Sequence, residues 1–380
     1  MTQILFRSLT IDGINGSAAN EQWYPHVSRS YKRFLFCQLL RKSPSNIIIS
    51  RTDSIGDVVL TLPMAAVLKQ CFPGSKIGFI GKAYTRAVIN ACEYIDEFID
   101  RSDFLNNRVT VAGAEPDTII HIFPDAAIAS RALRLGIDTR IGTTNRVYHW
   151  GTCNKLVKLS RRHSDLHEAQ LNLQLLKPLG CPADLSLANI GQLFGLTKLL
   201  PLPQRFSSLL QPDKYNLILH PKSQGSAREW GLDNFSKLIK LLDKNFYNIL
   251  ISGTAKERSF LDPLFEKAGS RVTDITGQMN LDELISFIAH ADGLVANSTG
   301  PLHLAAALGK DALGIYPPMR PIHPGRWAPL GPGARVFVLD KFCTDCKKAP
   351  SLCHCISEIG PELIQQSLDR SIAQMKKIIA

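Results

Sequence analysis

The sequence predicts an α/β protein built from two doubly wound domains in tandem. Short apolar runs alternate with stretches of helical spacing from Asn46 onward, and the alternation restarts near Tyr215 after a proline-rich interruption. This pattern is typical of parallel sheets with helices on both faces. The length of 380 residues agrees, because one hydrophobic core rarely grows beyond about 250–300 residues. We therefore expect two sheets, each with its own helices.

The first domain is predicted over 45–205, after an N-terminal extension over 1–44 that has little periodicity. The run NIIIS at 46–50 is short, apolar and β-branched, which predicts a buried strand. Apolar residues at helical spacing after Asp57 predict a helix. The same two patterns predict strands at 76–81, 117–123 and 138–142, and helices over 84–95, 126–135 and 165–179.

The connection between the domains is placed in 181–213, where prolines are frequent and periodicity is weak. The second domain is predicted over 206–358, and the final segment, 359–380, is predicted to be a helix that returns to the first domain. The expected strands of the second domain lie at 215–221, 247–253, 272–276, 293–297, 311–316 and 335–340, and its helices over 232–242, 257–268, 281–290 and 300–308.

The composition indicates which kinds of binding partner and which cellular compartment to expect. A net charge of +11 favours anionic partners such as phosphates, nucleic acids or acidic lipid headgroups. No apolar run reaches the roughly 18–20 residues of a membrane span, and the start of the chain lacks a signal-peptide pattern. Nine cysteines, most of them without a framework, fit a reducing compartment. We expect a cytoplasmic protein, either free or peripheral at the inner face of the cytoplasmic membrane.

The loop after the first strand, in RTDSIGDVVLTLP (51–63), is the first candidate site. Because ligands bind outside the carboxyl ends of the strands in such sheets, this polar loop is expected to face the cleft between the domains. Gly56 allows a close approach of ligand or backbone, and Asp57 stands where a carboxylate can cap the next helix. A helix cap and a proton acceptor are both open for Asp57 at this point.

The stretch NSTGPLHLAAALGK (297–310) predicts an anion site at the start of a helix. Ser298 and Thr299 are good capping types, Gly300 leaves the backbone uncovered, and Pro301 suits the first helical turn. Free amide groups and the helix dipole therefore point toward whatever lies above them. His303 follows one turn later, where it either donates to a phosphate oxygen or simply packs.

Two further loops follow strands. HPKSQGSAREWGLDNF (220–235) places Lys222, Ser223 and Arg228 before a helix, which suits a diphosphate, although solvated loop charges would look the same. SGTAKER (252–258) puts Glu257 at a helix start, either as a cap or as a contact to a ribose or sugar hydroxyl. No dinucleotide-type glycine motif, P-loop or Asp-x-Asp pair is present, so the basic loops would have to hold a diphosphate themselves.

Together with HPGRWAPLGP (323–332), these stretches resemble glycosyltransferase family 9, the bacterial lipopolysaccharide heptosyltransferases, over most of 46–380. The resemblance implies a GT-B fold, in which the first domain binds the acceptor and the second binds the nucleotide sugar. It also implies inverting transfer of a heptose from ADP-L-glycero-D-manno-heptose to the inner core of lipopolysaccharide. The implied partners are an ADP-sugar donor and a lipid-linked saccharide acceptor, and no metal or other cofactor is implied.

The resemblance also implies residue roles. Asp57 matches the family's catalytic base, which takes the proton of the acceptor hydroxyl, while fixed positive charge stabilises the departing nucleoside diphosphate. Two positions depart from the family pattern: Ser298 stands where an aspartate is usual, and Arg228 where a lysine is common. The implied acceptor-side loop is Arg51, Asp53, Ser54 and Gly56, and the implied donor-binding residues are Lys222, Ser223, Arg228, Glu257, Ser298, Thr299, Gly300, Pro301 and His303.

The segment CTDCKKAPSLCHC gathers Cys343, Cys346, Cys353 and Cys355, a set that either binds a structural zinc or serves no metal. Two other functions stay open. One is a transferase or epimerase that uses a different nucleotide sugar. The other is a basic nucleic-acid-binding protein, although the basic residues are dispersed and no interleaved aromatic module is present.

Overall fold

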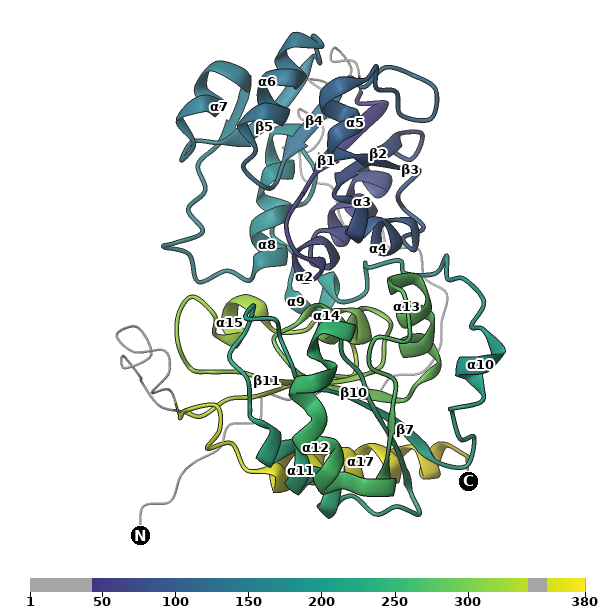
Figure 1. Ribbon diagram of the computed structural model, residues 1–380. Helices are drawn as coiled ribbons and strands as arrows, with labels where there is room; N and C mark the ends of the chain where they lie inside the picture. The colour runs from purple at the N-terminus through teal and green to yellow at the C-terminus, as the bar shows by residue number, and fades with distance from the viewer. Residues whose placement is uncertain (1–42, 341–353, 380) are drawn as a thin grey trace.

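The computed structural model describes residues 43–340 and 354–379. The predicted N-terminal extension up to residue 42 and three of the four clustered cysteines, Cys343, Cys346 and Cys353, lie outside the described residues. Within the described part, two separate sheets divide the chain into a first half and a second half, which are stacked one above the other in Figure 1.

The first half is built on a six-stranded parallel sheet in the order β3-β2-β1-β4-β5-β6. Its central strand owes its place to Ile47, Ile48 and Ile49, which are fully buried between helices on both faces. The strands are β1 (Asn46–Ser50), β2 (Lys76–Gly81), β3 (Glu97–Asp100), β4 (Thr118–His121), β5 (Thr139–Thr143) and β6 (Lys155–Val157). The helices are α2 (Ile55–Val59), α3 (Leu62–Cys71), α4 (Arg86–Asn90), α5 (Arg101–Asn106), α6 (Ala126–Arg134), α7 (Val147–Thr152) and α8 (Glu168–Leu173).

The second half carries a six-stranded parallel sheet in the order β12-β11-β10-β7-β8-β9. The strands are β7 (Tyr215–His220), β8 (Tyr247–Ile251), β9 (Val272–Asp274), β10 (Gly293–Asn297), β11 (Asp311–Ile315) and β12 (Ala334–Phe337). The helices are α11 (Leu232–Leu241), α12 (Asp262–Ala268), α13 (Leu281–His290), α14 (Gly300–Ala307), α15 (Pro324–Trp327) and α17 (Pro361–Ile379), and the short helices α9 (Leu187–Ile190) and α10 (Gln204–Ser207) lie in the connection.

Both sheets have the same topology, since the third, second, first, fourth, fifth and sixth strands of each half follow one another in space. This order is that of doubly wound nucleotide-binding sheets. It confirms the predicted α/β class and the two doubly wound domains. The boundaries 45–205 and 206–358 stay predictions, and the switch point beside the first strand of each half is where a ligand is expected.

Several local predictions were wrong. The helical pattern over 165–179 gives only α8 followed by a 3₁₀ turn from Gln174 to Leu179, since Pro178 interrupts the α-helical hydrogen bonds. The helix expected over 84–95 ends at Asn90. The strands β3 and β6 were not predicted; both are short and lie at a sheet edge, where less of the strand is buried.

The C-terminal helix does not return to the first half. In its described side chains, Ile364 and Leu368 belong to the buried core of the second sheet, beside α11. Polar contacts fix the same position: Tyr247 Oη donates to Asp369 at 2.7 Å, and Arg335 donates to the Ser367 carbonyl at 2.9 Å. The prediction was wrong because the apolar side of α17 finds its partners on the second sheet.

The two halves meet where α2 and α14 pack together (Figure 1). A methyl group added to Gly56 would lie 2.9 Å from His303 Cδ2, and one added to Gly300 would lie 2.9 Å from Ile55 Cγ2. Only glycine leaves room for contacts this close. The two loops singled out from the sequence, which begin their respective helices, are therefore in direct contact. Among the described residues no helix has the length and apolar character needed to cross a membrane.

Candidate active site

Arg51 is the centre of the polar loop that follows β1. Its side chain is almost fully buried, and its guanidinium donates to both carboxylate oxygens of Asp53, at 2.7 and 2.9 Å, and to Asp57. The burial opposes the charge of Arg51, but the carboxylates of Asp57, Asp53 and Glu168 raise the pKa of the guanidinium above its usual value. Arg51 therefore stays charged and fixes the two aspartates of the loop.

Asp57 lies inside the first turn of α2 rather than at its cap. The helix begins at Ile55 with Ser54 as its N-cap residue, and the Ser54 hydroxyl donates to Asp57 Oδ2 at 2.5 Å. The cap position considered for Asp57 was wrong by three residues, because the polar loop is shorter than the sequence pattern suggested. Asp57 keeps 16% of its side chain exposed, so it is held by Arg51 and Ser54 yet remains open to the cavity described below.

Asp53 is the second carboxylate of this loop. Burial raises the pKa of Asp53, Arg51 opposes that rise, and the nearby Asp57 adds to it. The hydroxyl of Tyr84 also donates to the Asp53 carbonyl at 2.5 Å. These contacts hold the loop in one conformation.

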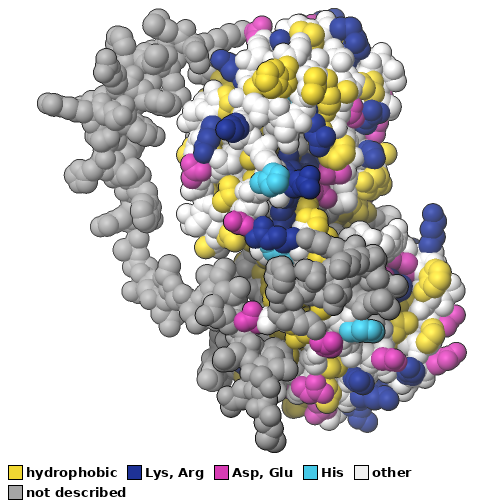
Figure 2. Space-filling view, turned by 90° about the vertical axis from the view of Figure 1, so that its left-hand side faces the viewer, with side chains coloured by type: hydrophobic (Ala, Val, Ile, Leu, Met, Phe, Trp, Pro, Cys, Tyr) yellow, Lys and Arg dark blue, Asp and Glu magenta, His cyan; other side chains and the backbone are white. Residues whose placement is uncertain are grey.

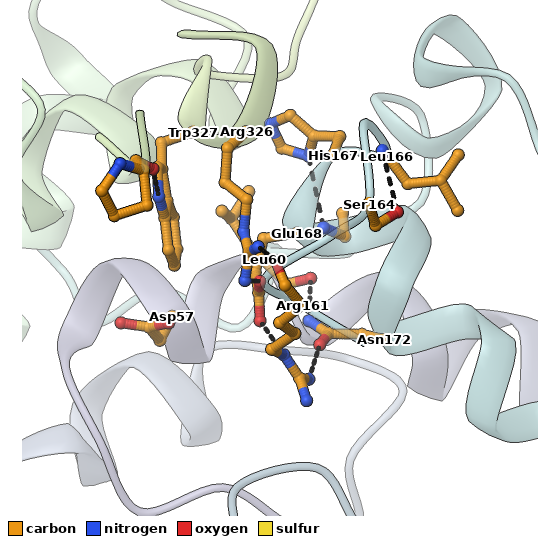
Figure 3. A network of polar contacts seen from close by, with 12 residues as sticks. Asp57, Leu60, Arg161, Ser164, Leu166, His167, Glu168, Asn172, Arg326 and Trp327 are labelled. Carbon is orange, nitrogen blue, oxygen red and sulfur yellow. Dashed lines mark hydrogen bonds and ion pairs between the residues drawn. The ribbon is translucent and has the colours of Figure 1, made fainter. Parts of the chain in front are cut away.

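Glu168, at the start of α8, joins the two halves. It is 1% exposed and accepts from Arg51 and Arg161 of the first half, each at 3.0 Å, and from Arg326 of the second half at 2.5 Å. Figure 3 shows Arg161 and Arg326 directed toward this carboxylate. Burial would raise the pKa of Glu168, but the three arginines outweigh burial and lower the pKa to about 2.

Two further contacts cross the junction. Arg326 donates to the Arg161 carbonyl, and a ring nitrogen of His167 lies 3.0 Å from the Ala328 carbonyl. The Trp327 ring extends from the second half toward Asp57 in Figure 3. The segment around α15 is therefore held directly over the polar loop of the first half.

A cavity of about 230 Å³ opens beside these residues. On the face shown in Figure 2, basic side chains and a histidine gather near the middle, where the halves meet. Most of the lining comes from the first half. The lining residues are Arg51, Asp53, Asp57, His121, Ile122, Phe123, Pro124, Thr143, Asn145, Arg146, His149, Arg161, Glu168, Arg326 and Trp327.

The predicted donor loops of the second half are tied to one another. The side chain of Asn297 accepts from the Trp230 backbone N–H and donates to the Pro221 carbonyl, both at 2.9 Å. The Gln224 amide donates to the Thr254 hydroxyl at 3.1 Å. These bonds join the loop 221–230 to the end of β10 and to the turn that carries Glu257, so three loops far apart in sequence form one surface.

Within that surface some predicted residues are paired. Lys222 binds Glu229 at 2.5 Å, and the Ser223 backbone N–H donates to the same carboxylate at 3.0 Å. Glu257 forms a capping box with Thr254, whose backbone N–H donates to Glu257 Oε2 at 2.8 Å. The cap predicted for Glu257 is therefore present, and Glu229 is a partner of Lys222 that the sequence did not reveal.

Four of the predicted donor-binding residues have a polar atom that is buried without a partner among the described residues. They are Arg228 Nε, Glu257 Oε1, Thr299 Oγ1 and His303 Nδ1. Thr299 is the N-cap residue of α14, with Pro301 in the first turn, yet its hydroxyl caps nothing. Buried polar atoms without partners are few in native proteins, so their gathering here points to a ligand-binding surface.

His303 is neutral near pH 7. Its burial, together with the nearby His167, lowers its pKa to about 3. The ring covers Gly56 of the first half, so it packs at the junction as one of the two sequence interpretations expected. Ser298, at the same helix start, lies in hydrogen-bond contact with Tyr316.

The sequence did not reveal Glu168, Arg161, His121 or His149. His121 ends β4 and so carried the same strand-end signal as Asp57, whereas nothing near Glu168 in sequence indicated its three arginine partners. Among the described residues no group of three or more His, Cys, Asp or Glu side chains is placed to hold a metal ion, and Cys355 is buried.

Known proteins resemble this chain in sequence and in fold. A protein of Haemophilus influenzae described as a putative glycosyltransferase is 25% identical over 346 residues, which cover 88% of this chain and 96% of that protein. The crystal structure of a family 9 glycosyltransferase from Veillonella parvula superposes with a TM-score of 0.69 at 18% identity, covering 87% of this chain and 98% of that one.

A second structure, the ADP-heptose lipopolysaccharide heptosyltransferase II of Escherichia coli, superposes with a TM-score of 0.65 at 18% identity, covering 87% of this chain and 99% of that one. These likenesses confirm the expected GT-B fold. Residues 126–357 also match the profile of glycosyltransferase family 9 (heptosyltransferase), which is more than half of the 380 residues. The chain therefore belongs to glycosyltransferase family 9 and is a glycosyltransferase.

Proposed function

We propose that this enzyme transfers a heptose from an ADP-activated donor to a saccharide of the lipopolysaccharide inner core, with inversion at the anomeric carbon. The solved relative from Escherichia coli is an ADP-heptose lipopolysaccharide heptosyltransferase, which supports this donor and acceptor. The acceptor in that case is lipid-linked, so the enzyme would act at the inner face of the cytoplasmic membrane. No cofactor beyond the donor is part of the proposal.

One observation carries the proposal: α2, which bears Asp57, packs directly on α14, which begins at the Thr299 turn. A carboxylate of the first half and the start of α14 in the second half therefore lie at one junction. Displacement at an anomeric carbon needs a proton acceptor on one side and stabilisation of a leaving diphosphate on the other. The two halves supply one requirement each.

In this proposal the acceptor occupies the cavity beside Asp57. The Asp57 carboxylate takes the proton of the acceptor hydroxyl while the hydroxyl oxygen forms its bond to the anomeric carbon. The bond between that carbon and the diphosphate oxygen breaks, and its electron pair leaves with ADP. Arg51 and Ser54 donate hydrogen bonds to the Asp57 carboxylate and fix its orientation beside the cavity.

The donor occupies the second half in this proposal. The backbone amides at Gly300 and the Thr299 hydroxyl face the diphosphate, with Arg228 and Lys222 as nearby positive charges. The unpartnered Glu257 Oε1 accepts a ribose hydroxyl. Ser298 takes the position at which relatives usually carry an acid, so the identity of the transferred sugar is the part of the proposal that most needs a direct assay.

The test is a transfer assay. Purified enzyme is incubated with ADP-heptose, or with ADP- and UDP-hexoses, and with deacylated inner-core oligosaccharides, and the products are identified by mass spectrometry. A mass increase of one heptose with ADP-heptose alone supports the proposal. Transfer of a different sugar, or conversion of the nucleotide sugar without an acceptor, contradicts it.

Asp57→Asn should lower kcat by roughly 100-fold or more, the usual size of a general-base contribution. The affinity for ADP, measured by calorimetry, should stay within about twofold of wild type, because Asp57 lies in the first half. Asp53→Asn is the matched control, since it removes the same charge from the same arginine. Equal losses of kcat in the two variants would contradict the assignment of Asp57 as the base.

A further inference from the structure

His121, the last residue of β4, lines the cavity that also exposes Asp57. The side chain is 1% exposed, and neither ring nitrogen has a hydrogen-bond partner among the described residues. Burial, with a smaller effect of His149, lowers the pKa of His121 to about 3, so the ring is neutral near pH 7. A neutral ring carries one N–H donor and one nitrogen acceptor. Both are left unused in the fold.

His149, on α7, lines the same cavity, and its ring centroid lies 5.6 Å from that of His121. The backbone N–H of Thr143 donates to His149 Nδ1 at 3.0 Å. The same Nδ1 lies 3.2 Å from the Thr143 carbonyl, so it is bonded to the Thr143 backbone in either neutral tautomer. Nε2 is buried and has no partner among the described residues, so His149 adds a further unused ring nitrogen.

Unpaired buried polar atoms lower the stability of a fold, and those of native proteins call for a physical reason. Here three ring nitrogens on two neighbouring histidines are unpaired, and both side chains line a cavity of about 230 Å³. Hydrogen bonds within the fold do not explain them. An occupant of the cavity that bonds these nitrogens does.

The donors and acceptors favour a hydroxylated occupant. A sugar hydroxyl both accepts and donates, so it can pair with a ring N–H and with a bare ring nitrogen, whichever neutral tautomer each histidine adopts. An ionised carboxylate has no proton to give to a bare ring nitrogen. Phe123 and Trp327 supply aromatic surface to the same cavity, and Asn145 adds a further amide.

We propose that His121 and His149 form an acceptor subsite that binds hydroxyl groups of the acceptor sugar within the cavity. This inference rests on the proposed transfer to a saccharide and goes beyond it by naming two residues that neither the sequence pattern nor the relatives assigned. The histidines orient the acceptor beside Asp57 without exchanging a proton with it.

Two variants test the subsite. His121→Leu removes both unused ring nitrogens at similar volume, and His149→Asn keeps a polar group for the Thr143 backbone while removing the unpaired Nε2. The matched control is His290→Asn on the exposed end of α13, where the ring bonds the Ser286 carbonyl and lies outside the cavity. Steady-state kinetics use ADP-heptose and a deacylated inner-core oligosaccharide, and thermal unfolding is followed for every variant.

For each of the two variants we expect the KM for the oligosaccharide to rise roughly three- to tenfold, the size of one or two lost hydrogen bonds. The KM for ADP-heptose should stay within about twofold of wild type. The unfolding temperature of His121→Leu should equal or exceed that of wild type, because unpaired polar atoms are removed. The control should match wild type in all three measurements.

Unchanged oligosaccharide KM values in both variants would overturn the subsite while leaving the proposed function intact. A lower unfolding temperature with unchanged kinetics would assign the histidines to the fold or to a bound water. If His121→Leu does not fold, the KM of His149→Asn decides alone. If wild type transfers nothing to any oligosaccharide, the proposed function fails, and the subsite fails with it.

Discussion

Glu168 is a single buried carboxylate shared by three arginines, two from the first half and one from the second. Such a group has a large desolvation cost, which its partners must offset. Its pKa of about 2 shows that the arginines more than offset the burial. Removing the charge therefore leaves Arg161 and Arg326 without the carboxylate that they share, while Arg51 keeps Asp53 and Asp57.

Glu168→Gln should lower the free energy of unfolding by about 3–5 kcal/mol at pH 7, as for other broken buried pairs. A glutamate in an unfolded chain has a pKa near 4.3. Since the folded pKa is lower, the stabilisation is fully present above that value and is lost as the pH falls through about 2. The difference between wild type and variant should thus be constant above about pH 5 and shrink by pH 3.

The measurement is urea unfolding at pH 7, 5, 4 and 3. Glu266→Gln on α12 is the control, because its side chain is exposed; it should change stability by less than about 0.5 kcal/mol at each pH. A difference between wild type and Glu168→Gln that persists unchanged at pH 3 would show that the charge of Glu168 does not carry the effect.

At the scale of elements, the packing of α2 on α14 depends on a pair of glycines. The methyl group of alanine at position 56 would meet the buried ring of His303, whereas Gly74 has no heavy atom near its added methyl group. Overpacking costs about 1–3 kcal/mol, and the better helix propensity of alanine returns at most about 1 kcal/mol. The contact between the two helices should therefore tolerate no side chain at position 56.

Gly56→Ala should lower both stability, by about 1–2 kcal/mol, and kcat, because the methyl group forces the two halves apart. Thermal unfolding and the transfer assay measure both effects. The double variant Gly56→Ala/His303→Ala should regain part of the lost stability, and Gly74→Ala should behave as wild type in both measurements. No rescue by the second substitution would mean that another contact carries the loss.

The elements that the sequence predicted well are those with local signals. A buried strand followed by a polar turn and a helix can be recognised within about twenty residues, and so the loops with Asp57, Thr299 and Glu257 were found. Within each doubly wound sheet such loops share one edge, and the edges of the two sheets were expected to face each other across the cleft. The exact helix start at Ile55, three residues earlier than expected, depends on Ser54 and had no equally clear signal in the sequence.

At the scale of the whole molecule, the sequence could not predict the contacts that join the halves. Arg326 of the second half meets Glu168 of the first across 158 residues, and a charged residue carries no local sign of such a partner. The prediction of where α17 packs was wrong for the same reason. The apolar side of the helix suits either sheet, and its polar partners Tyr247 and Arg335 are far away in sequence.

The ion pair between Arg326 and Glu168 should hold the halves in register, because both side chains are buried. Arg326→Gln should reduce stability by roughly 3 kcal/mol and enlarge the radius of gyration of the free enzyme, seen by small-angle X-ray scattering. Arg320 forms a second pair between the halves, with Asp165, but both side chains are largely exposed, so Arg320→Gln should cost less than about 1 kcal/mol and leave the scattering unchanged. Equal effects of the two variants would mean that the loss of a positive charge, rather than the loss of the buried ion pair, weakens the contact between the halves.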